Sequence, residues 1–360
     1  MKESFLTREL RLPFGKPYLR TRDLMIFCRY FATLIEAGIM LHKSLLLLEK
    51  QTEHKLLKER IKDVAARVER GYSLTESLRA NSDVFPEFFI NMAAAGEAGG
   101  FLGDALQKLA LYFEKQYELE QKIRSATMYP KFIACAALVV VVFMITAILP
   151  AFATIFESMG IEMPILTRLL ISAGNLLVFY WYIFLIVVVA ILIFGRGLLK
   201  SNRGRLLYDI LRLRNPFFGT VYRKTITARF CRTLGALLEN GIAMLPALDL
   251  VGKIMENSIY EKNIYQAKEK IIQGYSLAAA LSGVKLFPSL VVEMCNVGEQ
   301  TGHLEEMLVR TANFLETEVS HSINRLSAMI EPLLILFMAG IIIIIALSVI
   351  LPMFEMYRMI

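Results

Sequence analysis

Three long stretches of this sequence contain no charged residue, and they constrain its fold more than any other feature. The stretches run from Phe132 to Leu149, from Leu169 to Phe194 and from Leu333 to Leu351. A helix needs roughly 20 apolar residues to cross the hydrocarbon core of a bilayer. The core helix of a soluble protein rarely runs this far without a polar residue. We therefore expect transmembrane helices over residues 131–155, 169–194 and 332–352.

Positive charge is concentrated on one side of these stretches. Lys122, Arg124 and Lys131 precede the first stretch, whereas residues 151–168 contain one basic residue, Arg168. Basic flanks stay in the cytosol, so we expect a cytosolic N-terminus and an external C-terminus. We expect six basic residues after the second stretch to form a collar on anionic lipid headgroups: Arg196, Lys200, Arg203, Arg205, Arg212 and Arg214. Docking of this collar to an acidic partner is a further hypothesis.

An internal repeat covers most of the chain. Phe27-Cys28-Arg29 recurs as Phe230-Cys231-Arg232, and Gly71-Tyr72-Ser73-Leu74 recurs as Gly274-Tyr275-Ser276-Leu277, in both cases 203 residues later. After the loss of one residue the match continues, and Pro130 and Pro150 correspond to Pro332 and Pro352. The pattern predicts two copies of one module, each a domain followed by one apolar span.

Each module shows helical periodicity and no strand pattern. In the first module, apolar residues recur every three or four positions from Asp23 to Ala37. Further helices are expected over about 41–51 and 56–70, from a capping box at Ser73, from Pro86 to about Gly99, and from Phe101 to about Met128. The predicted fold class is therefore all-α: two repeated six-helix-bundle cytosolic domains plus three transmembrane helices.

The domain boundaries follow from these patterns. We expect an N-terminal arm (1–20), cytosolic helical domain 1 (21–130), an external loop (156–168), a basic juxtamembrane linker (195–223), cytosolic helical domain 2 (224–331) and an external tail (353–360). The N-terminal residues lack an apolar core of signal-peptide length, so we expect no cleavage there.

A Gly-Glu-x-x-Gly-x-Leu motif occurs once in each module, directly before the long helix that leads into a span. Its members are Gly96, Glu97, Gly100 and Leu102, and again Gly298, Glu299, Gly302 and Leu304. One reading is structural: the glycines end a helix, and the glutamate caps the next helix or its exposed amides. The other reading is a partner contact, or a divalent cation held with the help of Glu97.

Prolines stand at matching places beside the spans. Pro130, Pro150, Pro332 and Pro352 are candidate hinges through which motion of the cytosolic domains reaches the membrane. The alternative is that Pro130 and Pro332 simply mark where a cytosolic helix kinks as it enters the bilayer.

No enzymatic chemistry is indicated. The sequence contains no GxxxxGK[ST], GxGxxG, HExxH or GxSxG motif, its four histidines have no metal-ligand spacing, and its four cysteines form no CxxC pair. We predict a protein that is not an enzyme, with no cofactor, no metal and reduced structural cysteines. The net charge is +7, but aromatic residues are not interleaved with the basic run, so nucleic acid is not an expected partner.

Together, these features resemble the family of F-type platform proteins of type II secretion and PilC-type proteins of type IV pili. The resemblance covers residues 21–355 and includes the start of the first span, with Lys122-Ile123, Tyr129-Pro130 and Ile148-Leu149-Pro150. Thr127 stands where the family favours an aliphatic residue. The resemblance leaves pilus, secretion and competence machines open.

The resemblance implies a multi-pass protein of the cell inner membrane with no chemistry of its own. Its implied partners are a hexameric assembly ATPase, pilin or pseudopilin subunits, other inner-membrane assembly proteins, membrane lipids and further copies of itself. The implied role is to couple the ATPase to insertion of the subunits. The alternative function is a small polytopic transporter or channel subunit, although no charged residue lies inside the three apolar stretches.

Overall fold

The computed structural model describes five long segments of the chain. They are residues 19–148, 201–215, 219–255, 257–284 and 286–359, together with isolated positions between 150 and 190. The predicted N-terminal arm, external loop and second span therefore lie wholly or largely outside the described residues. The described positions of the second span, such as Phe179 and Tyr182, are helical. The described residues contain no strand, so the all-α prediction is confirmed for them.

The first module contains six α-helices within residues 19–148. These are α1 (Thr21–Glu36), α2 (Leu41–Gln51), α3 (Lys55–Glu69), α4 (Leu74–Arg79), α5 (Glu87–Gly99) and α6 (Leu102–Phe143). The predicted ends of α1 and α3 are confirmed, because Gly38 and Gly71 follow them with φ angles of 75° and 92°, a region that favours glycine. The predicted capping box is also present: Ser73 and Glu76 each accept a hydrogen bond from the other's backbone N–H, at 3.0 and 3.1 Å.

The second module repeats this order of helices within the described part of residues 219–359. Its helices are α10 (Gly219–Glu239), α11 (Met244–Ile254), α12 (Ser258–Ile272), α13 (Leu277–Ser282), α14 (Ser289–Thr301) and α15 (Leu304–Met359), and α9 (Asn202–Arg214) precedes them. Helices α11 to α14 have 11, 15, 6 and 13 residues, the same lengths as α2 to α5. The prediction of two repeated helical domains is confirmed.

Aromatic rings form the centre of both modules. The Phe27, Phe85 and Phe89 rings lie with centroids 5.4 to 5.9 Å apart, and each side chain is at most 2% exposed. In the second module, the centroids of Phe230 and Phe287 are 4.8 Å apart. Phe230 and Phe287 occupy the repeat positions of Phe27 and Phe85, so the matching residues build matching cores.

The described residues belong to two compact units, whose limits differ from those of the modules. The first unit contains those of residues 1–119, 229–256 and 261–313, and the second contains those of 120–228, 257–260 and 314–360. Contacts between the two modules therefore occur inside the first unit. The second unit holds α9 and the later parts of α6 and α15.

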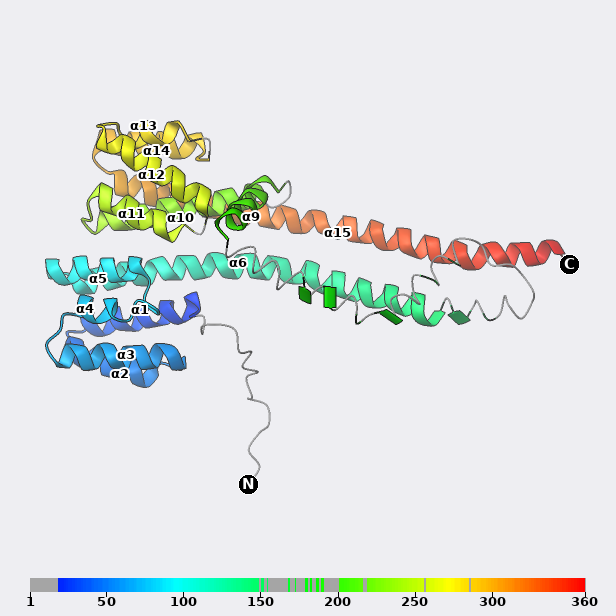
Figure 1. Ribbon diagram of the computed structural model, residues 1–360, viewed down its shortest axis with the longest axis horizontal. Coiled ribbons are helices and arrows are strands. Elements are labelled where there is room, and N and C mark those ends of the chain that lie inside the picture. The colour runs from blue at the N-terminus through cyan, green and yellow to red at the C-terminus, as the bar shows by residue number, and fades with distance from the viewer. Residues whose placement is uncertain are drawn as a thin grey trace, which may run out of the picture. The chain divides into compact units, whose positions relative to one another are not determined.

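Helices α6 and α15 run from a helical bundle into an apolar stretch without interruption (Figure 1). Within the part of the chain that the structure describes, two helices, Leu102–Ile148 and Leu304–Ile343, are long and apolar enough to cross a membrane. Their most apolar windows have mean hydropathies of 2.6 and 2.3, and none of either window is buried. The last bundle helix and the first predicted span are thus one helix, with Pro130 inside it.

Candidate functional site

The Gly-Glu motif of the first module holds the start of α4. The Glu97 carboxylate accepts hydrogen bonds from the backbone N–H groups of Leu74 at 2.6 Å and Thr75 at 2.9 Å, and from the Thr75 hydroxyl at 2.5 Å. The first N–H groups of a helix have no partner inside the helix, and its positive end attracts a carboxylate. With the capping box of Ser73 and Glu76, every N–H from residue 73 to 76 has an acceptor.

The second module has the same glutamate cap but lacks two of the hydrogen bonds that accompany it in the first module. Glu299 accepts hydrogen bonds from the backbone N–H groups of Leu277 at 2.5 Å and Ala278 at 3.2 Å. Alanine residues occupy the positions of Thr75 and Glu76, so the additional hydroxyl donor and the capping box are missing there. The feature common to both modules is therefore one half-buried carboxylate on two backbone amides.

The prediction that each glutamate caps the next helix is wrong. The capped residues, Leu74 and Leu277, lie 23 and 22 residues before the glutamates that cap them. The motif is thus a tertiary contact between α5 and α4, and between α14 and α13. Among the described residues, no group of three or more His, Cys, Asp or Glu side chains could hold a metal ion. A partner contact at Glu97 and Glu299 stays a hypothesis.

The second glycine of each motif ends its helix. Gly100 and Gly302 follow α5 and α14 with a φ angle of 73° in both modules. The next residue, Phe101 or His303, donates its backbone N–H to the carbonyl of the motif's first glycine, at 2.9 and 3.0 Å. This is the left-handed helix ending that glycine favours.

The first glycine of each motif lets two helices approach closely. Gly96 and Gly298 are buried, and a Cβ atom on them would lie 2.6 Å from Ala105 Cβ and 2.7 Å from Leu304 Cα, respectively. Carbon atoms that are not bonded to each other are almost never found this close in proteins. The glycines therefore place the ends of α5 and α14 directly against the starts of α6 and α15.

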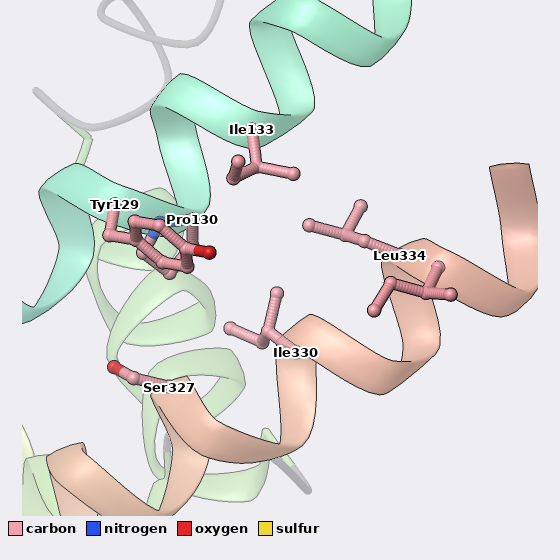
Figure 2. A pocket seen from close by; sticks show the side chains of 7 residues that line it. Tyr129, Pro130, Ile133, Ser327, Ile330 and Leu334 are labelled. Carbon is pink, nitrogen blue, oxygen red and sulfur yellow. The ribbon is translucent and has the colours of Figure 1, made fainter.

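Pro130 removes one hydrogen bond from α6, and α15 supplies a replacement. Proline has no N–H, so the Ala126 carbonyl four residues earlier has no helical donor. The Ser327 hydroxyl donates a hydrogen bond to this carbonyl at 3.0 Å. Beside it, Ile133 from α6 and Leu334 from α15 project toward the same hollow (Figure 2), a cavity of about 120 Å³. The two long helices are thus joined where their apolar stretches begin.

The other candidate hinges lie in or next to continuous helices. Pro332 and Pro352 are inside α15, whereas Pro150 follows a π-helical turn at Met144–Ile148. A π-helical turn shifts the backbone hydrogen bonds by one residue and often marks an irregularity such as a proline. The hinge role of these prolines stays a prediction.

Four of the six collar residues lie on α9, namely Arg203, Arg205, Arg212 and Arg214. Arg196 and Lys200 lie outside the described residues. The Arg212 guanidinium stands 4.7 and 5.0 Å from the ring centroids of Tyr208 and Tyr222. Helix α9 also exposes large apolar side chains, with Leu207 at 61% and Leu211 at 68%. Basic and exposed apolar residues on one helix are typical of a helix lying in a membrane interface.

Three of the four cysteines lie in the bundles and are buried. Burial raises the pKa of the Cys28 and Cys231 thiols well above their usual value, and it raises the pKa of Cys295 to about 12. Because the thiolate is the reactive form, these thiols are neutral and unreactive near pH 7, in agreement with the structural role predicted for them.

Sequence reasoning missed several residues at these sites. Ser327, Thr75 and Tyr112 make side-chain hydrogen bonds to partners 201, 22 and 121 residues away, respectively. The absence of a helical donor for the Ala126 carbonyl could be read from Pro130. No local pattern indicates which side chain satisfies it.

Comparison with known proteins identifies the family. A protein-family model described as Type II secretion system (T2SS), protein F matches residues 27–150 and again residues 230–352, one match for each module. A Type IV pilus assembly protein PilC from Thermus thermophilus is 39% identical over 351 residues, which are 97% of this chain and 86% of that protein. A PilC protein from Myxococcus xanthus is 35% identical over 341 residues, 95% of this chain and 82% of that protein. A Type II secretion system protein F from Aeromonas hydrophila is 33% identical over 342 residues, 94% of this chain and 88% of that protein. Both modules match the family, and the relatives align over nearly the whole length, so this chain belongs to the family of type II secretion system protein F and PilC-type pilus assembly proteins.

Proposed function

We propose that this chain is the inner-membrane platform of a type IV pilus or type II secretion-like assembly machine. In this role it couples a cytosolic assembly ATPase to the insertion of pilin or pseudopilin subunits. One observation carries the proposal: in each matched module, a single helix leads from a bundle into an apolar stretch. A contact on the bundle is therefore linked to the membrane by one helix rather than by a loop.

The proposed role is mechanical and does not include catalysis. The glutamates of the Gly-Glu motifs accept hydrogen bonds from backbone amides, and the thiols in the bundles are buried. Three apolar stretches without charge are better suited to a scaffold than to a transport path, which needs polar groups at mid-membrane.

Topology is part of the proposal. We place the bundles at 21–130 and 224–331 in the cytosol, three spans at 131–155, 169–194 and 332–352, and the C-terminal tail outside. The basic residues and exposed leucines of α9 support a position at the cytosolic membrane surface. The exposed apolar windows of α6 and α15 support two of the spans.

Cysteine labelling tests this topology in intact cells. A cysteine in place of Met159 is expected to react with a membrane-impermeant maleimide. Cysteines in place of Glu53 or Asn257 are expected to react after the membrane is opened, with denaturant for Asn257 because that residue is buried. A Cys135→Ala background removes the exposed native thiol. Labelling of position 53 in intact cells, with none at 159, would contradict the orientation.

Deletion of the gene tests the function itself. We expect cells without this protein to lose the surface pilus or the secreted product while their pilin or pseudopilin level stays normal. Affinity purification of the tagged chain from detergent extracts is expected to recover the assembly ATPase and the subunit. Normal assembly in the deletion strain would refute the platform role. The control is the same strain complemented with the intact gene.

A further inference from the structure

The first compact unit has a pocket at the side of its first three helices. The pocket has a volume of about 260 Å³ and is lined by residues of α1, the end of α2 and the start of α3. Its inner lining includes the buried side chains Leu48 and Leu57, whereas Asp23 and His54 in the lining are partly exposed. An apolar interior with a few polar groups is typical of a site that receives an apolar group.

In the second module, α9 covers the region that corresponds to the opening of this pocket. Asp209 of α9 accepts a hydrogen bond from the backbone N–H of Ser258, the first residue of α12, at 2.9 Å. The repeat counterparts of the two partly exposed polar residues are Ile226 and Asn257, which are 6% and 0% exposed. All four residues belong to the second compact unit, as α9 does. The positions that are open in the first module are thus buried in the unit that contains α9.

The internal repeat continues into the segment before α1. Leu10-Arg11 and Pro13-Phe14 recur as Leu213-Arg214 and Pro216-Phe217, 203 residues later. The same spacing of 203 residues relates the ends of α1, α2 and α3 to those of α10, α11 and α12. Since α9 ends at Arg214, its sequence counterpart in the first module is the segment that ends at Arg11.

This segment has leucine where α9 is buried. Asp209 and Leu213 are four residues apart, and they are 2% and 9% exposed. Their counterparts are Leu6 and Leu10. Two leucines four residues apart can contact one apolar surface from a single turn of helix, so the segment has the apolar pair that the pocket requires.

The segment is polar where α9 is open. Leu207 and Leu211 of α9 are 61% and 68% exposed. Their counterparts are Ser4 and Arg8. The segment therefore has one apolar side that suits the pocket and one polar side that suits water.

The pocket itself differs from its counterpart in the way that an apolar occupant requires. Leu57 stands at the position of Tyr260, whose larger side chain is fully buried in the second unit. Lys55 stands at the position of Ser258, and the aliphatic part of a lysine side chain packs well on leucine. The link from Arg11 to the start of α1 is long enough, because nine residues span up to about 30 Å.

We propose that the segment from residue 5 to residue 14 covers this pocket in the same chain, with Leu6 and Leu10 against its apolar lining. The contact repeats in the first module what α9 does in the second. The pocket is then closed by the chain itself and is not a free surface for a partner. The proposal goes beyond the platform function, because it concerns an intramolecular contact that is measured without pilus assembly.

Crosslinking of the full-length protein in detergent tests the contact. The counterparts of Asp209 and Ser258 are Leu6 and Lys55, so both are replaced by cysteine in a Cys135→Ala background, where the remaining native thiols are buried. The protein is treated with dibromobimane, a short reagent that becomes fluorescent when it bridges two thiols. We expect a fluorescent band at the mass of the monomer on a denaturing gel.

Two further pairs provide the controls. Asp209→Cys with Ser258→Cys is the positive control, because these residues are in contact. Leu6→Cys with Tyr72→Cys is the negative control, because Tyr72 follows the far end of α3, a helix about 22 Å long. An equal signal from the Tyr72 pair, or no monomer signal from Leu6→Cys with Lys55→Cys, would overturn the proposal. So would a fluorescent band at the mass of a dimer alone, which would place the segment on a second copy.

A second pair of variants tests which side of the segment faces the pocket. Leu10→Asp, added to Leu6→Cys with Lys55→Cys, is expected to lower the monomer signal roughly tenfold, because the segment loses a buried leucine. Arg8→Asp in the same background is expected to leave the signal unchanged, because the counterpart of Arg8 is exposed on α9. Equal effects of the two aspartates would contradict the proposed orientation. Normal pili in a deletion strain would refute the platform function and leave these signals unchanged.

Discussion

Replacing Glu97 by alanine is expected to lower the free energy of unfolding by about 3 kcal/mol, because a buried donor that loses its acceptor costs about 1–3 kcal/mol. Glu97 serves three donors at once: the backbone amides of Leu74 and Thr75 and the Thr75 hydroxyl. The midpoint of thermal unfolding, followed by circular dichroism on the detergent-purified protein, is expected to fall by roughly 5–10 °C. An unchanged midpoint would mean that water replaces the carboxylate as the acceptor without loss of stability.

Two variants separate this stabilising role from a partner contact. Thr75→Ala removes the hydroxyl donor and is expected to cost about 1 kcal/mol. Glu97→Gln keeps one oxygen acceptor and is expected to unfold at a midpoint between those of the wild type and Glu97→Ala. If Glu97→Gln keeps the normal protein level and yet abolishes pilus or pseudopilus assembly, the loss reports a partner contact at this motif. Normal assembly in Glu97→Gln and Glu299→Gln would leave both glutamates as helix caps.

Replacing Gly96 by alanine is expected to destabilise the first module by about 1–3 kcal/mol, because a methyl group added to a closely packed site forces the backbone to move. The new Cβ would lie 2.6 Å from Ala105 Cβ and 3.0 Å from Leu102 Cα. The second contact is with backbone, so rotation of a side chain cannot relieve it. The expected result is a lower unfolding midpoint and a lower protein level in membranes.

Gly103→Ala is the matched control for this variant. Gly103 is in the first turn of α6, and a Cβ there would meet Glu36 Cγ and Ile35 Cγ2 at 3.7 Å, an ordinary contact distance. Alanine favours the helix over glycine by about 1 kcal/mol, so Gly103→Ala is expected to leave the midpoint unchanged or raise it. Equal destabilisation by the two alanines would show that the close approach at Gly96 is not the cause.

Several features of the fold were predicted correctly because local physics decides them. Gly38 and Gly71 end their helices through the conformational freedom of glycine, and Ser73 begins α4 because its hydroxyl accepts a hydrogen bond from the N–H of Glu76, three positions ahead. The repeat was predictable for the same reason, because equal spacings of caps, glycines and apolar residues specify equal helices. The one wrong inference, that Glu97 caps the following helix, assumed that a cap is always local.

The sequence by itself determined the helical class, the two modules and the apolar stretches, since periodicity, caps and hydropathy act over a few residues. Tertiary structure decided which groups satisfy one another across long separations. It brought the Glu97 carboxylate within hydrogen-bond distance of the first amides of α4, and the Ser327 hydroxyl within reach of the Ala126 carbonyl, which has no helical donor because of Pro130. It also brought the Tyr112 and Thr233 hydroxyls together. A repeated sequence predicts two equal surfaces on each module, but only packing selects which surface of one copy covers which surface of the other.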